Sequence, residues 1–313
     1  MSEVCVDRDL VFSRPTTGDL VLDLYRPTTG DNPVPVVVWL HGGGWFTGDR
    51  TLAPDLNRFV RATGMAVASI EYRLSGQALY PAQLHDVRSA IRFLRASAAR
   101  FGLDPLAVGV WGASAGGHLA ALAGLTGNLD SLPGEPESEG DASVQAVAES
   151  YGPVDLAEVV AEATAGRSGA DGSRTPEARL IGGHPAEHSE LAQQASPLHW
   201  VHPGAPPFQI SHGTGDVLVS YRQSERLHET LIAAGGSSEL YLLKSYKHGF
   251  LNPAGRLDVE LAGVMDDGRL TAEEAASAVH HTSDDPSAAR QDTTFGFDDV
   301  ESFFRRHLNP RSA

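Results

Sequence analysis

The sequence has one cysteine, no long apolar run and few basic residues, and each shortage excludes a class of protein. Because Cys5 is the only cysteine among 313 residues, no intrachain disulfide forms, and most cysteine-rich metal sites are excluded. No run of 18 apolar residues appears, so the sequence predicts no membrane-spanning helix. Lys and Arg number 24 against 40 Asp and Glu, and a net charge of −16 argues against binding to nucleic-acid phosphates.

The composition that is present is ordinary for a globular protein. Hydrophobic residues make up 41% of the chain and charged residues 20%, which is enough apolar material for a large core. The first nine residues carry carboxylates where a signal peptide has basic and then apolar residues. We therefore expect a soluble, cytoplasmic protein that folds as a single domain over residues 1–313. Composition alone gives no function.

Short apolar runs alternate with longer helical patterns along the chain. This alternation predicts an α/β protein in which a mostly parallel sheet of about eight strands is covered by helices on both faces. The first two runs are suited to an antiparallel hairpin. The predicted strands are residues 4–12, 20–25, 34–40, 65–72, 107–112, 144–151, 208–213 and 238–243. The predicted helices are residues 82–101, 118–125, 220–234 and 295–308.

Two stretches break this alternation. Residues 155–207 contain short helical patches interrupted by Gly and Pro, which indicates a cap-like insertion. Residues 252–294 separate the last predicted strand from the final helix. In that segment Thr271-Ala-Glu-Glu274 has the pattern of a capping box and predicts a short helix over 271–281. The segment has few large apolar residues, so we expect it to lie on the surface, near the pocket or against another subunit.

The strongest chemical signal is Gly112-Ala-Ser-Ala-Gly116, which follows a predicted strand and precedes an apolar helix. In that context G-x-S-x-G is the pattern of a nucleophile elbow, a sharp turn that lifts the Ser114 hydroxyl off the sheet. The amides at the start of the helix face the developing negative charge of a reaction intermediate. The competing interpretation is a Gly-rich turn with an ordinary N-cap serine, and the strand-turn-helix context favours the nucleophile.

A run of glycines, His41-Gly-Gly-Gly-Trp45, follows the predicted strand that ends at Leu40. Its unshielded backbone amides, together with the Ala115 amide, are suited to an oxyanion hole. For His41 the sequence favours a role in fixing the loop over a role as a base. Trp45 is a candidate substrate-binding residue, although ordinary packing explains it equally well.

A nucleophilic serine needs a base and an orienting carboxylate, and in an elbow fold the acid and then the histidine follow the serine along the chain. Asp216 and His248 each come just after a predicted strand, in that order. The main rival acid, Asp155, also follows a strand but comes one strand too early, and Glu149 falls inside a strand. The chain holds 13 histidines, and most of the others lie away from strand ends.

The sequence contains no motif for a metal or a cofactor. There is no His-Glu-x-x-His, no pair of cysteines and no Gly-Lys-[Ser/Thr] after the glycine run. His280-His281 near Asp284-Asp285 is more typical of a solvated polar surface than of a divalent metal site. We therefore expect no cofactor and no metal.

Taken together, these motifs resemble those of the α/β-hydrolase esterases, most closely the bacterial carboxylesterases of the hormone-sensitive-lipase and feruloyl-esterase-like groups. The resemblance covers about residues 34–250, roughly two thirds of the chain. It implies an α/β-hydrolase fold with Ser114 as nucleophile, Asp216 as acid and His248 as base. It also implies Gly43, Gly44 and Ala115 as the oxyanion donors. The segment 252–294 departs from the resemblance, because the final helix of such esterases follows the histidine sooner.

The function expected from this pattern is hydrolysis of carboxylic esters of small soluble substrates through an acyl-enzyme. Acyl transfer, lactonisation or cyclisation, and amide cleavage use the same three residues, and the sequence does not choose among them. A non-catalytic ligand receptor of the same fold is a more distant alternative, because such receptors lack the histidine that His248 supplies. The expected partner is a small ester, without nucleic acid or membrane, and a homo-oligomer is left open.

Overall fold

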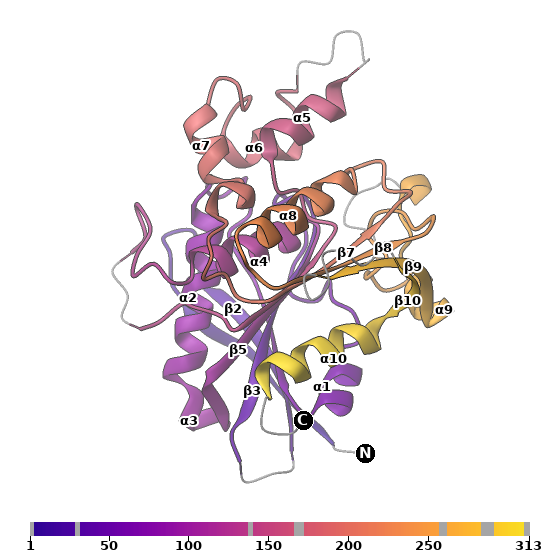
Figure 1. Ribbon diagram of the computed structural model, residues 1–313. Helices are drawn as coiled ribbons and strands as arrows, with labels where there is room; N and C mark the ends of the chain where they lie inside the picture. Colours follow the sequence, from indigo (N-terminus) through magenta and orange to yellow (C-terminus); the bar gives the residue numbers. More distant parts are fainter. Residues whose placement is uncertain are drawn as a thin grey trace.

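A ten-stranded sheet forms the centre of the computed structural model, which describes residues 3–28, 32–136, 140–165, 172–256, 262–282 and 291–309 (Figure 1). The strands lie in the order β1-β2-β4-β3-β5-β6-β7-β8-β9-β10. They are β1 (Val4–Ser13), β2 (Leu20–Pro27), β3 (Val34–Leu40), β4 (Ala66–Ile70), β5 (Leu103–Ala113), β6 (Ala146–Ser150), β7 (Phe208–Gly213), β8 (Ser238–Leu243), β9 (Ala275–Thr282) and β10 (Gln291–Gly296). All eight predicted strands are present, and β9 and β10 are additional.

The middle of the sheet is parallel and its two ends are antiparallel. Strands β4, β3, β5, β6, β7 and β8 run in the same direction. The predicted antiparallel hairpin of β1 and β2 closes one end, and β9 and β10 close the other. The apolar composition of β3 fits its position, because six of its seven side chains are buried between helices that cover both faces. The prediction of a mostly parallel, doubly covered sheet is confirmed.

Helices cover the sheet on both faces and form two separate apolar cores (Figure 1). Helices α2, α4 and α8 pack on one face, and α1 and α10 pack on the other. Among the described residues, no helix is both long and apolar enough to cross a bilayer. The helices on the sheet are α1 (Leu56–Thr63), α2 (Ala82–Ala96), α3 (Ala98–Phe101), α4 (Ala115–Thr126), α8 (Arg222–Ala233) and α10 (Phe297–Leu308).

The insertion between β6 and β7 is helical, as its broken patches predict. It carries α5 (Leu156–Thr164), α6 (Pro176–Ile181), α7 (Ser189–Gln194) and the 3-10 turn η1 (Pro197–Trp200). Figure 1 shows α5, α6 and α7 standing beyond the end of the sheet. Side-chain caps start two of these helices, because Asp155 accepts a hydrogen bond from the Glu158 amide and Thr175 from the Ala178 amide. The insertion follows β6 and lies above the carboxyl ends of the parallel strands (Figure 1).

The prediction for residues 252–294 is wrong in two respects. The helix expected over 271–281 is only the short α9 (Arg269–Glu273), which follows the 3-10 turn η2 (Ala262–Val264), and Glu274 ends it with a φ of 62°. The chain then forms β9, whose alternating small residues place Ala276 and Ala278 in the core. Because β9 pairs with β8, and β10 with β9, these two strands extend the sheet. The part before α9 lies beside the candidate site, as expected, because the Asp266 amide donates to the His248 oxygen at 2.9 Å. Asp284 and Asp285 lie outside the described residues.

Candidate active site

Ser114 occupies the sharp turn between β5 and α4, as the elbow pattern predicts. Its φ of 55° and ψ of −122° are rare for a residue with a side chain, and such strain is a feature of functional sites. The two flanking glycines make the turn possible. A Cβ on Gly112 would lie 2.1 Å from the Gly116 oxygen, and a Cβ on Gly116 would lie 2.0 Å from the Leu40 oxygen. Glycine at both positions therefore allows the helix to pack directly against the strands behind the serine.

The structure brings Ser114, His248 and Asp216 into one hydrogen-bonded line. The loops after β7 and β8 supply Asp216 and His248, and both loops lie at the same edge of the sheet as the elbow. His248 Nε2 lies 2.8 Å from the Ser114 hydroxyl, and His248 Nδ1 lies 2.6 Å from Asp216 Oδ2. All three side chains are buried, with 4% to 8% of their surface exposed. A serine, an imidazole and a carboxylate in this order can transfer the hydroxyl proton to the ring.

The Asp216 carboxylate is surrounded by hydrogen-bond donors. Oδ1 accepts hydrogen bonds from the backbone amides of Leu218 and Val219, at 2.8 and 3.0 Å. His212 Nε2 lies 3.2 Å from Oδ2, the oxygen that also faces His248. Burial acts to raise the pKa of Asp216, but the charge of His248 and the hydrogen bonds from both histidines outweigh it and hold the pKa well below the usual range. Asp216 is therefore a carboxylate across the physiological pH range.

The two rival acids have other positions. Asp155 caps α5 by accepting a hydrogen bond from the Glu158 amide at 3.1 Å, and it lies 3.3 Å from Arg226. Glu149 is fully buried at the end of β6, where its carboxylate accepts a hydrogen bond from the Gly152 amide. Burial raises the pKa of Glu149 to about 8, against the lowering effect of Gly152 and Ser224.

Two of the three predicted oxyanion donors lie at the pocket, one from the glycine loop and one from the start of α4. Gly44 and Ala115 line its wall beside Ser114, whereas Gly43 does not line it. Among the described residues, neither the Gly44 nor the Ala115 amide donates to a backbone oxygen outside the regular helices and strands. Gly43 has a φ of 110°, and a Cβ there would lie 2.2 Å from the Thr47 oxygen. Glycine is therefore required at 43 for the shape of the loop.

His41 has the predicted position of a loop anchor. Its ring is buried, stacks on Tyr72 at a centroid distance of 4.3 Å, and donates from Nδ1 to the Gly42 oxygen at 2.7 Å. Burial lowers the pKa of His41 to about 4, so the ring is neutral at pH 7. The Tyr72 hydroxyl donates to the His41 oxygen at 2.9 Å. These contacts hold the start of the glycine loop in place.

Trp45 is both a packing residue and part of the pocket wall. Its Nε1 donates to His118 Nδ1 at 3.2 Å, and His118 Nε2 donates to the Ala195 oxygen at 2.6 Å. Burial lowers the pKa of His118 to about 4, which leaves the neutral ring able to accept from Trp45. This chain of contacts joins the glycine loop, the helix that follows Ser114, and the insertion. It was not predicted, because contacts between residues 73 and 77 positions apart leave no local pattern.

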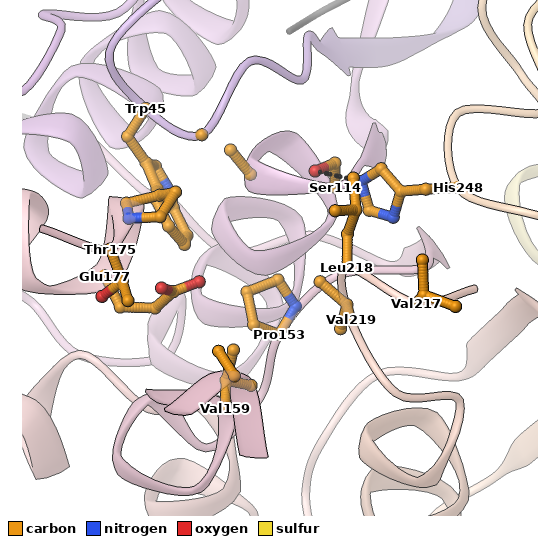
Figure 2. A pocket seen from close by; sticks show the side chains of 14 residues that line it. Trp45, Ser114, Pro153, Val159, Thr175, Glu177, Val217, Leu218, Val219 and His248 are labelled. Carbon is orange, nitrogen blue, oxygen red and sulfur yellow. Dashed lines mark hydrogen bonds between the residues drawn. The ribbon is translucent and has the colours of Figure 1, made fainter. Parts of the chain in front are cut away.

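A cavity of about 240 Å³ opens onto Ser114 and His248 (Figure 2). Most of its wall is apolar, and the insertion supplies one side of it. Figure 2 shows the Glu177 carboxylate pointing into the cavity from α6, a residue that the sequence did not single out. The remaining lining residues are Gly44, Trp45, Ala115, Pro153, Val159, Ala163, Thr175, Pro176, Val217, Leu218 and Val219.

A family model and solved structures both match this chain. The BD-FAE model matches residues 22–231, which include Ser114 and Asp216 and end before His248. The chain belongs to the BD-FAE family. A truncated carbohydrate esterase from gut microbiota has a similar structure, with a TM-score of 0.67 and 28% identity over 77% of this chain and 88% of that one. The BD-FAE chain thus has the α/β-hydrolase fold that its motifs predict.

Curated relatives of the BD-FAE chain are named esterases. It is 36% identical to Esterase LipC of Mycobacterium tuberculosis, over 74% of this chain and 57% of the relative. It is 35% identical to Esterase LipQ of the same organism, over 74% of this chain and 54% of the relative. The chain thus spans about half the length of these curated relatives. Their similarity supports ester chemistry for this family.

The described residues of the BD-FAE chain hold no group of three or more His, Cys, Asp and Glu side chains placed to bind a metal ion. His280 stacks on Tyr241, with ring centroids 4.4 Å apart, and the ring of His281 lies 6.0 Å from that of His228. Both histidines lie on β9 in the sheet. Aromatic packing therefore accounts for this histidine pair.

Proposed function

We propose that this protein is a serine hydrolase that cleaves carboxylic esters of small substrates through an acyl-enzyme intermediate. The observation that carries the proposal is the hydrogen-bonded line from Ser114 through His248 to Asp216, which opens onto the cavity. The relatives named esterases support the same class of reaction. We further propose that the protein is cytoplasmic, which its single cysteine supports.

In the first half of the reaction, His248 Nε2 takes the proton of the Ser114 hydroxyl as Oγ attacks the ester carbonyl carbon. Asp216 accepts the hydrogen bond of Nδ1–H, which fixes the ring tautomer and stabilises the imidazolium that forms. The C–O bond to the alcohol then breaks, and the imidazolium gives its proton to the leaving oxygen. The product of this half is an ester between the acyl group and Ser114.

In the second half, water repeats the attack on the acyl-enzyme. His248 takes a proton from the water, whose oxygen bonds to the carbonyl carbon, and Ser114 leaves as the hydroxyl when the ring returns that proton. The negative oxygen of each tetrahedral intermediate needs hydrogen-bond donors, and we assign this role to the amides of Gly44 and Ala115. The loop geometry that Gly43 permits supports Gly44, and we retain Gly43 as a third candidate donor.

The size and the lining of the cavity favour short-chain or small aromatic esters. A cavity of about 240 Å³ is below the range of about 300–1,000 Å³ typical of sites for drug-sized ligands. Trp45 and the side chains of Val159, Leu218 and Val219 supply apolar contact area for a small acyl or aryl group. Such walls suit a small soluble ester better than a long lipid chain.

Steady-state kinetics with 4-nitrophenyl acetate, butyrate and decanoate test this proposal. We expect Ser114→Ala to lower kcat by at least about 10⁴-fold, because loss of the nucleophile removes the covalent route. Ser189→Ala, at an exposed position on α7, is the matched control and should retain the parent rate. A Ser114→Ala enzyme within tenfold of the parent would contradict the assignment, and a preference for decanoate would contradict the expected substrate size.

A further inference from the structure

Glu177 is a buried carboxyl group in the wall of a largely apolar cavity. It lies in the first turn of α6, with 6% of its surface exposed. Among the described residues that line the cavity, it is the one Asp or Glu side chain. Figure 2 shows its carboxylate pointing into the space between Trp45 and Pro153, on the side of the cavity opposite His248. Ser114 and this carboxylate therefore line the same cavity.

No basic side chain is recorded as an ion-pair partner of Glu177 in the part of the chain that the structure describes. Arg179, two residues further on, instead places its guanidinium over the Phe46 ring, 4.3 Å from the ring centroid. Burial raises the pKa of Glu177, and its own backbone N–H and the Thr175 hydroxyl offset this effect only in part. Buried charges in proteins are normally paired, so a cationic ligand can supply the partner that the described residues do not.

The surroundings of Glu177 also suit a cation. The Trp45 ring lines the same cavity, and its Nε1 edge is already engaged with His118. An aromatic ring beside a carboxylate is a favourable environment for an ammonium group, because the ring face attracts positive charge. The chain as a whole carries a net charge of −16, which raises the local concentration of cationic ligands. A neutral hydroxyl group would use only the hydrogen-bonding capacity of the carboxylate and would gain nothing from the ring face or the net charge.

We propose that the cavity takes esters that carry an ammonium group, with Glu177 as its counter-ion and Trp45 as its aromatic wall. The proposal rests on the proposed ester hydrolysis, because it concerns the substrate class of the same site. The apolar walls then contact the carbon chain between the ammonium and the ester carbonyl, and Glu177 contributes to substrate binding rather than to bond cleavage.

Two pairs of esters test the proposal, and the members of each pair differ only in a nitrogen cation and the neutral carbon that replaces it. The first pair is acetylcholine and 3,3-dimethylbutyl acetate, in which the charged or neutral group lies on the alcohol side of the ester. The 4-nitrophenyl esters of 4-(trimethylammonio)butanoate and 5,5-dimethylhexanoate place it on the acyl side. Because the cation contacts both the Glu177 carboxylate and the Trp45 ring, we expect kcat/KM to favour the charged member of at least one pair by about tenfold or more.

The decisive variant is Glu177→Gln, which keeps the size and a hydrogen-bond acceptor but removes the charge. We expect the charged-to-neutral ratio of kcat/KM to fall to near one in this variant, mainly through KM. Glu187→Gln is the matched control, because Glu187 lies exposed on the same insertion outside the cavity, and it should keep the parent ratio. If Glu177→Gln does not fold, tetramethylammonium provides a second measurement, because it should inhibit the wild-type enzyme competitively where tert-butanol does not.

The two proposals fail in different ways. Hydrolysis of both members of each pair at equal rates would overturn the ammonium proposal and leave ester hydrolysis intact. A charged-to-neutral ratio that survives in Glu177→Gln would equally overturn the role of Glu177. Preference for 2-hydroxyethyl acetate over propyl acetate, without preference for either cation, would replace the ammonium by a hydroxyl group. Failure to hydrolyse any of these esters or 4-nitrophenyl acetate would overturn both proposals together.

Discussion

His212 lies against the same carboxylate oxygen of Asp216 that faces His248, with its Nε2 3.2 Å from Oδ2. The Val219 oxygen, which can only accept, also lies 3.0 Å from this Nε2, so Nε2 carries a proton and donates. His212 Nδ1 lies 2.8 Å from the Ser224 hydroxyl. A second buried histidine thus contacts the acid of the proposed triad at the oxygen that also faces His248.

The environment of Asp216 predicts a large effect of Asp216→Asn. Backbone amides donate to one carboxylate oxygen and two histidines to the other, so the amide NH₂ of Asn meets a donor in either orientation. We expect kcat/KM to fall by about 10⁴-fold, because the imidazole loses its fixed tautomer. Steady-state kinetics on 4-nitrophenyl acetate measure this.

Asp155→Asn is the matched control for that substitution. Because Asp155 caps α5, we expect at most a loss of about 1 kcal/mol in the free energy of unfolding, with the rate retained. An inactive Asp155→Asn variant beside an active Asp216→Asn variant would reassign the acid.

Glu149 predicts a specific dependence of stability on pH. Its folded-state pKa of about 8 lies above the ordinary value of 4.5, so the folded protein holds this proton more tightly than the unfolded chain. The resulting contribution of Glu149 to the free energy of unfolding is fully present below pH 4.5 and is lost as the pH rises toward 8. Glu149→Gln does not titrate, so we expect it to gain stability over the parent by about 1.4 kcal/mol for each pH unit in this window.

Urea unfolding at pH 5, 6, 7 and 8 measures this difference. The exposed Glu187→Gln variant is the control and should show no such growth with pH. A constant difference between parent and Glu149→Gln across the four pH values would show that Glu149 does not retain its proton in the folded state.

The position of β9 in the sheet predicts that this strand contributes to the stability of the fold. Ala278 is fully buried and pairs with Leu243, whereas the neighbouring Ser277 is exposed. We expect Ala278→Asp to cost on the order of 3–5 kcal/mol, because it buries an unpaired charge. Ser277→Asp should change the free energy of unfolding by less than about 0.5 kcal/mol. Equal, small effects of both substitutions on thermal unfolding would contradict the assignment of β9 to the core sheet.

The sequence predicted the parts of this structure that depend on local pattern. The apolar runs located eight strands, and the positions of Ser114, Asp216 and His248 at strand ends predicted that they would meet. Strand β9 was predicted as helix, because Thr271-Ala-Glu-Glu274 has the pattern of a capping box. Pairing with β8, which is distant in the chain, determines its conformation instead.

The contacts around the candidate site join residues far apart in the chain, and no local pattern predicts such contacts. Trp45 meets His118, and Glu177 enters the cavity from an insertion whose fold has no periodic pattern. A glutamate that follows a proline in the first turn of a helix is common on protein surfaces, so the sequence around Glu177 did not indicate a pocket residue. Only the packing of α6 over the cavity distinguishes it.

The most direct test of the central assignment is mass spectrometry of the protein after treatment with a fluorophosphonate. We predict one covalent adduct per chain, on the peptide that contains Ser114, together with complete loss of ester hydrolysis. Ser114→Ala should give no adduct, and His248→Ala should react far more slowly, because the hydroxyl then lacks its base. An adduct on another serine, or unmodified Ser114 in fully inhibited protein, would contradict the account.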